Sequence, residues 1–164
     1  MKFWFDTEFI EDGKTIDLMS IGIVSEDGRE FYVENRDCDL RPASKWVREN
    51  VFPHLVNLKH FDYGKPYIAS SRSSMDFDQI GPAVLEFIGN DNPEIWAYYA
   101  DYDWVAMCQL FGTMMDLPKG WPMYCRDLKQ LAGDTPLPEQ GKGEHHALAD
   151  ARWTRDAWQY VTSL

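Results

Sequence analysis

Two carboxylates separated by one residue are the first sign of chemistry in this chain. Asp6 and Glu8 lie in the aromatic run of residues 3–9, whose composition favours a β-strand. Because successive side chains on a strand point to opposite faces, this spacing places both carboxylates on one face. Acids this close raise each other's pKa unless a cation lies between them, and their oxygens suit Mg²⁺ or Mn²⁺. The alternative interpretation is the solvated face of an edge strand.

Further acids and a histidine in the second half of the chain carry the same kind of chemistry. Asp101 and Asp103 follow a predicted strand over residues 94–99, where α/β sheets bind ligands, although an Asp there can instead cap the next helix. His145 precedes the last predicted helix, and Asp150 lies in its second turn. A spacing of five is poor for two side chains on one unbroken helix, so we expect His145 on the approach to it. Two exposed polar residues are the alternative there.

Composition limits the class of protein. The chain of 164 residues, 45% hydrophobic and 15% aromatic, predicts one domain over residues 1–164 with a buried core. Its net charge of −11 argues against a surface that coats nucleic acid, unless metal ions offset the carboxylates locally. The three cysteines lack metal-ligand spacing and are predicted to be reduced thiols. We expect a cytoplasmic protein that does not contact membranes, because no targeting or long apolar segment is found.

An α/β fold is predicted to position these residues. Residues 3–9, 15–25 and 31–33, joined by Asp-Gly turns, predict an antiparallel three-stranded meander. The second strand is apolar at both parities, so elements should pack on both faces of the sheet. Helices are predicted over about 41–52, from Ser73 or Ser74 to Gly89, after Asp103, and over about 146–162. The basic loop of residues 57–74 is either solvated surface or a flap contacting phosphate.

Taken in order, these residues resemble the DEDDh family of 3′-to-5′ exonucleases over nearly the whole chain. The first motif of that family is Asp-x-Glu, the second an Asp after a later strand, and the third His-x₄-Asp. The matching positions are Asp6 and Glu8, then Asp103, then His145 and Asp150. Each motif alone is weak, whereas the ordered set is specific. The amino-acid sequences around the first and last motifs are most similar to those of the polyadenylate-specific 3′-exoribonuclease AS group.

The resemblance decides two choices that spacing leaves open, selecting Asp103 over Asp101 and His145 over His146. It implies a ribonuclease H-like fold with a mixed five-stranded sheet, formed by the meander plus two further strands. It also implies a homodimer. One departure is Tyr99, which stands where many relatives carry Asn, so contacts at this strand end are expected to differ.

By the same resemblance, the chain is expected to shorten single-stranded RNA, or 3′ overhangs, from a free 3′ end to nucleoside 5′-monophosphates. The four carboxylates would hold two Mg²⁺ or Mn²⁺ ions, His145 would accept the proton of the attacking water, and Glu8 would also contact the terminal 3′-hydroxyl. A DNA exonuclease and a catalytically silent nucleic-acid-binding domain are the alternatives. Core packing is the alternative for the apolar members of the predicted substrate contacts, which are Thr7, Phe9, Leu18, Met19, Lys65 and Arg72.

Overall fold

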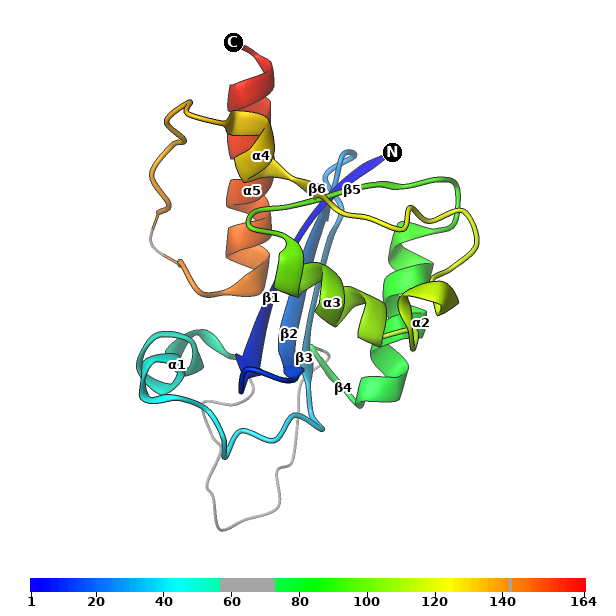
Figure 1. Ribbon diagram of the computed structural model, residues 1–164, viewed down its shortest axis with the longest axis vertical. Helices are drawn as coiled ribbons and strands as arrows, with labels where there is room; N and C mark the ends of the chain where they lie inside the picture. Colours follow the sequence, from blue (N-terminus) through cyan, green and yellow to red (C-terminus); the bar gives the residue numbers. More distant parts are fainter. Residues whose placement is uncertain (57–72, 142) are drawn as a thin grey trace.

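The computed structural model describes residues 1–56, 73–141 and 143–164 and contains a mixed sheet between two layers of helices (Figure 1). In spatial order the six strands are β4 (Ser74–Met75), β3 (Glu30–Asn35), β2 (Ile16–Ser25), β1 (Lys2–Glu11), β5 (Glu94–Ala97) and β6 (Arg126–Asp127). The predicted α/β class is confirmed, and the predicted number of five strands is wrong. β4 and β6 are two residues each, which is too short to produce an alternating pattern in the sequence.

The meander β1–β2–β3 forms as the sequence predicts, with antiparallel pairing throughout. Its two turns contain Gly13 at φ 82° and Gly28 at φ 86°, in the left-handed region that glycine adopts at low cost. β5 then pairs parallel to β1, but only from Lys2 to Trp4 of that strand. Among the described residues, no strand pairs with the rest of β1 on this side, which leaves a free edge.

The described helical elements are α1 (Lys45–Asn50), the 3₁₀ turn η1 (Phe52–His54), α2 (Phe77–Ile88), α3 (Asp101–Gln109), η3 (Met114–Asp116), α4 (Leu128–Ala132) and α5 (Ala147–Thr162). Four of the helices, α1, α2, α3 and α5, lie at predicted segments with shifted ends. The predicted caps Ser73 and Ser74 are wrong for α2. Ser74 lies in β4, and Asp76 caps the helix in a reciprocal pair of bonds with Gln79.

Different helices cover the two faces of the sheet. α2 and α3 pack on one face, where residues such as Phe5, Ile21 and Ile23 are fully buried. α5 lies along the other face, where Trp4 contacts Trp158 with ring centroids 5.3 Å apart. This arrangement explains why β2 is apolar at both parities. A smaller core beneath α1 includes Ile10, Met19 and Leu55.

Gly22 determines how closely α5 approaches the sheet. It pairs with Asp6 across β1 and β2, and a Cβ atom at this position would lie 2.3 Å from the backbone nitrogen of Leu148. Any larger residue would push the first turn of α5 away. The absent side chain thus lets the helix that carries Asp150 start directly over β1 and β2.

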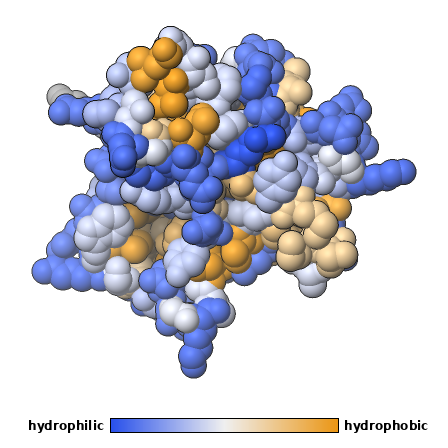
Figure 2. Space-filling model, turned by 45° about the horizontal axis from the view of Figure 1, so that its top comes forward, coloured by the Kyte–Doolittle hydropathy of each residue, from blue (hydrophilic) through white to orange (hydrophobic). Residues whose placement is uncertain are grey.

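The face shown in Figure 2 is mostly hydrophilic, with hydrophobic residues in separate small groups. Within the described residues, no helix is long and apolar enough to cross a membrane. Cys38, Cys108 and Cys125 are free thiols, as predicted.

Candidate active site

The free edge of β1 is where α3 reaches the sheet. Thr7 lies beyond the stretch that pairs with β5, and both its backbone N–H and its hydroxyl donate to one carboxylate oxygen of Asp103, at 2.8 and 2.5 Å. Asp103 is buried, whereas Asp101 on the same helix is exposed. The bonds from Thr7 therefore fix Asp103, and not Asp101, against the strand.

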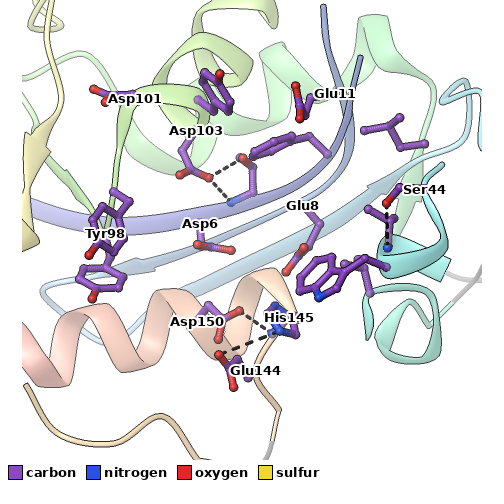
Figure 3. A pocket seen from close by; sticks show the side chains of 18 of the residues that line it. Asp6, Glu8, Glu11, Ser44, Tyr98, Asp101, Asp103, Glu144, His145 and Asp150 are labelled. Atoms are coloured by element: carbon purple, nitrogen blue, oxygen red, sulfur yellow. Dashed lines mark hydrogen bonds and ion pairs between the residues drawn. The ribbon is translucent and has the colours of Figure 1, made fainter. Parts of the chain in front are cut away.

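Asp6 and Glu8 point to the other side of β1, toward α5, so the expected placement on one face is present (Figure 3). The pairing of β1 with β2 shifts register between Glu8 and Phe9, which marks a β-bulge directly after the second acid. Asp150 faces the two acids from α5. Carboxylates from a strand and from helices on both faces of the sheet thus converge on one edge.

His145 lies on the turn before α5, as predicted. Its backbone has φ 68°, and its N–H donates to the Asp150 carboxylate at 2.8 Å. Ligand atoms of Glu8, His145 and Asp150 all lie within 4.8 Å of one another. The left-handed turn thereby overcomes the unfavourable spacing of five residues.

Burial and mutual repulsion shift the ionisation of these acids. Burial, then the neighbouring carboxylates, raise the pKa of Asp6 well above its usual value and that of Glu8 to about 8. Burial also raises the pKa of Asp103 to about 6, although the bonds from Thr7 oppose the rise. Burial likewise raises the pKa of Asp150 to about 6, although the hydrogen bond from the N–H of His145 opposes the rise. A bound cation would relieve this repulsion.

These groups lie in one cavity of about 740 Å³, within the range of ligand sites. Apolar and aromatic side chains, among them Phe9, Val47 and Tyr102, form part of its wall, and the ring centroids of Phe9 and Tyr102 are 5.8 Å apart. Its acidic lining consists of Asp6, Glu8, Glu11, Asp101, Asp103, Glu144 and Asp150. The described lining contains no Lys or Arg, so a polyanion would require added cations here.

The predicted substrate contacts have different outcomes. Thr7 and Phe9 line the cavity. Leu18 and Met19 do not, because both faces of β2 are covered; they are 1% and 0% exposed and belong to the cores, so the expectation that they contact bases is wrong. Two basic candidates, Lys65 and Arg72, lie outside the described residues.

Several cavity residues were not identified from the sequence. Trp46 belongs to the helix predicted over about 41–52; it is 54% exposed and lines the cavity. Tyr102 is also exposed there, and the Gln140 amide donates to Asp150 at 3.3 Å. Tyr99, already noted in the sequence as a departure at the strand end, is exposed in the cavity as well. The sequence does place aromatic residues at the end of a strand, which is one signal of a binding site. The same residues would also suit a buried core, so this pattern alone does not identify a cavity wall. Nothing in the sequence near Gln140 marks it.

Comparison with known proteins gives concordant results. A model of the family described as the 3′-5′ exoribonuclease Rv2179c-like domain matches residues 64–162. Two proteins of Mycobacterium tuberculosis are each 38% identical over 166 residues, which cover 99% of this chain and 94% of theirs. They are named 3′-5′ exoribonuclease Rv2179c, from strain H37Rv, and 3′-5′ exoribonuclease MT2234.1, from strain CDC 1551. With the model matching more than half of the chain and relatives matching nearly all of it, this protein belongs to the Rv2179c-like family of 3′-5′ exoribonuclease domains.

Proposed function

We propose that this protein is a metal-dependent 3′–5′ exoribonuclease that shortens single-stranded RNA or 3′ overhangs to nucleoside 5′-monophosphates. The observation that carries the proposal is the convergence of four carboxylates and one imidazole in a single cavity of about 740 Å³. The five residues are Asp6, Glu8, Asp103, His145 and Asp150. The names of the relatives support RNA as the substrate.

The donor set fits hard divalent cations. Asp6, Glu8, Asp103 and Asp150 offer only oxygen ligands, and their raised pKa values reflect negative charge that burial leaves uncompensated. These four residues would hold two Mg²⁺ or Mn²⁺ ions. When bound, such ions would stabilise charge on the scissile phosphate and lower the pKa of the attacking water.

The side chains of the protein then have separate tasks. The His145 imidazole, next to Glu8 and Asp150, accepts the proton of the attacking water, the general-base role that histidine most often performs in catalysis. Glu8 accepts a hydrogen bond from the terminal 3′-hydroxyl and so selects a chain end. The apolar wall near Phe9 and Val47 receives the terminal base.

The test is the digestion of a 5′-labelled single-stranded RNA with Mg²⁺, with Mn²⁺ and with EDTA. We expect a ladder shortened from the 3′ end only when metal is present, with strong inhibition by a 3′-phosphate. A circular RNA should remain intact, and its cleavage would show endonuclease action and overturn the proposal. A DNA oligonucleotide of the same sequence tests the deoxyribonuclease alternative, because faster digestion of DNA would favour it.

Two acids of α3 give a matched pair of variants. Asp103→Asn keeps an oxygen that can accept both bonds from Thr7, so the fold should survive while the metal ligand is lost. Asp101→Asn makes the same change of charge on an exposed side chain of the same cavity. We expect Asp103→Asn to lose at least about 100-fold in rate and Asp101→Asn to lose little. Equal losses would mean that only the overall charge of the cavity matters.

Two finer predictions follow from the family resemblance. A preference for adenine, which the polyadenylate-specific group implies, is measured by comparing A, U and C homopolymers. The implied homodimer is measured by sedimentation velocity.

A further inference from the structure

The backbone of Tyr99 adopts a conformation that is unusual for a tyrosine. It has φ 55°, in the left-handed region that glycine and asparagine enter more readily than a bulky residue. Tyr99 lies in the turn between β5 and α3, where the N–H of the next residue, Ala100, donates to the Asp127 carboxylate at 2.8 Å. The turn does not require a tyrosine, however. The Tyr99 side chain is 63% exposed, so core packing does not explain its size either.

The ring of Tyr99 belongs to a short row of aromatic rings beside the cavity. Its centroid lies 4.5 Å from that of Tyr98, which contacts Trp153 of α5 at 4.9 Å with an interplanar angle of 70°. The Trp153 indole is fixed in turn, because its N–H donates to the carbonyl of Pro138 at 3.1 Å. Tyr99 is therefore the exposed end of a supported row, and it lines the cavity.

Figure 3 shows where this row lies relative to the carboxylates. The parallel pairing of β5 with β1 ends at Trp96 and Trp4, and beyond it Tyr98 lies on the Asp6 side of the site, away from Glu8. The row thus stands at the Asp6 end of the cavity. Glu8 lies toward the other end in Figure 3, and Phe9, which follows it on β1, also lines the cavity.

We propose that Tyr99 is a stacking platform for the base of the penultimate nucleotide, on the 5′ side of the bond that is cut. This assignment rests on the proposed function, in which the 3′-terminal nucleotide occupies the Glu8 end. An exposed aromatic ring attracts any base through its π-face, and a purine offers more area than a pyrimidine. The site then recognises two stacked bases, one at each end of the carboxylate floor, with a preference for a purine at the penultimate position.

The test compares three short 5′-labelled RNAs in the first cleavage step only. One carries all its bases, one has a stable abasic analogue at the 3′-terminal position, and one has it at the penultimate position. For the wild type we expect kcat/KM to fall about 10-fold or more when the penultimate base is missing. Tyr99→Ala should lose a similar factor on the complete RNA and nothing further on the penultimate abasic RNA, while still responding to the terminal base.

Three further variants separate stacking from structural damage. Tyr99→Phe keeps an aromatic face and should resemble the wild type. Tyr99→Asn suits the left-handed turn, so its melting temperature should equal or exceed that of the wild type although its rate matches Tyr99→Ala. Tyr124→Ala removes a similarly exposed tyrosine, at 57%, that does not line the cavity, and should have no effect on the three rates.

The results also distinguish this assignment from the proposed function. A wild type that shortens RNA equally well with and without the penultimate base would overturn the assignment of Tyr99 alone. The same conclusion would follow if Tyr99→Ala and the wild type lost equally on removal of that base. A wild type that shortens no RNA would overturn the proposed function and this assignment with it.

Discussion

Trp46 contacts His145 edge to face, with ring centroids 4.8 Å apart and an interplanar angle of 78°. The indole comes from α1 and the imidazole from the turn before α5, about a hundred residues later in the sequence. The backbone of His145 is already tied to Asp150 by its N–H. The histidine is thus restrained at its backbone by Asp150 of α5 and at its ring by Trp46 of α1.

We predict that Trp46→Ala lowers kcat about 10-fold through loss of this restraint, because the imidazole then samples positions unsuited to proton transfer. Trp46→Phe retains an aromatic edge and should recover most of the rate. Tyr160→Ala, which removes a partly exposed aromatic residue near the end of α5, serves as the control. Single-turnover rates measure the effect. A change in KM alone for Trp46→Ala would assign the indole to substrate binding instead.

Replacing His145 is expected to reduce activity, whereas replacing its neighbour His146 is expected to reduce stability. His145→Ala should reduce kcat by about 100-fold or more with little change in melting temperature, because its ring is partly exposed in the cavity. His146 is the N-cap residue of α5, and its ring stacks on Tyr32 with centroids 4.5 Å apart. His146→Ala should therefore lower the melting temperature by several degrees while the folded fraction retains most of its activity.

Kinetics and thermal melting of the two histidine variants, measured on the same preparations, decide this prediction. Tyr32→Leu is a useful companion variant, since it removes the stacking partner of His146 and should reproduce the loss of stability. A 100-fold loss of kcat in a stably folded His146→Ala protein would show that the catalytic role belongs to His146 and not to His145.

The parts of the structure that local pattern determines were predictable from the sequence. Asp-Gly turns and alternating residues give the meander, and the i, i+2 spacing gives the common face of Asp6 and Glu8. The choice of Asp103 over Asp101 came only from the family resemblance, because its physical cause is a pair of bonds from Thr7, 96 positions away in the sequence. Contacts over such distances leave no local pattern.

The same reason explains the errors at Leu18 and Met19. Their apolar side chains suit either a base-binding wall or a core, and only the positions of α1, α2 and α3 relative to β2 decide between the two. Trp46 presents the opposite case, because this large apolar side chain is not buried in a core and lies on the cavity wall. Which layer covers a residue is a property of the tertiary fold.

Gly22 offers a steric test of how the site is assembled. Gly22→Ala places a methyl group 2.3 Å from the Leu148 nitrogen and 2.4 Å from the Ala147 carbonyl carbon, so the start of α5 must move away from β2. We predict a loss of activity of at least about 100-fold, because Asp150 and His145 move with that turn and a displacement of about 1 Å is costly in catalysis. The melting temperature should fall as well.

The matched control for Gly22 is Gly28→Ala. Gly28 lies at a hairpin turn with open space around its missing Cβ, so its replacement strains only the local backbone at φ 86°. This variant should lose some stability and keep its activity. Full activity of Gly22→Ala would show that the position of α5 does not determine the geometry of the site.

The raised pKa values of the site carboxylates predict how the metal-free protein responds to pH. Unfolded Asp and Glu release their protons near pH 4. The folded protein retains them until about pH 6 at Asp103 and Asp150 and about pH 8 at Glu8. Between these limits the folded state binds more protons, so the free energy of unfolding falls as pH rises. Burial lowers the pKa of His146, which opposes this trend near pH 6. This opposing contribution comes from one group, whereas several carboxylates contribute to the decrease.

In EDTA, we therefore predict a melting temperature that declines from pH 5 to pH 8, and Mg²⁺ should restore most of the loss at pH 8 by offsetting the carboxylate charge. Glu8→Gln should raise the metal-free melting temperature at pH 8 by about 2 °C or more and leave it unchanged at pH 5, where Glu8 is already protonated. Glu86→Gln, an exposed change on α2, is the control and should do neither. A metal-free protein that becomes more stable toward pH 8 would contradict the buried, mutually repelling carboxylates on which the metal site depends.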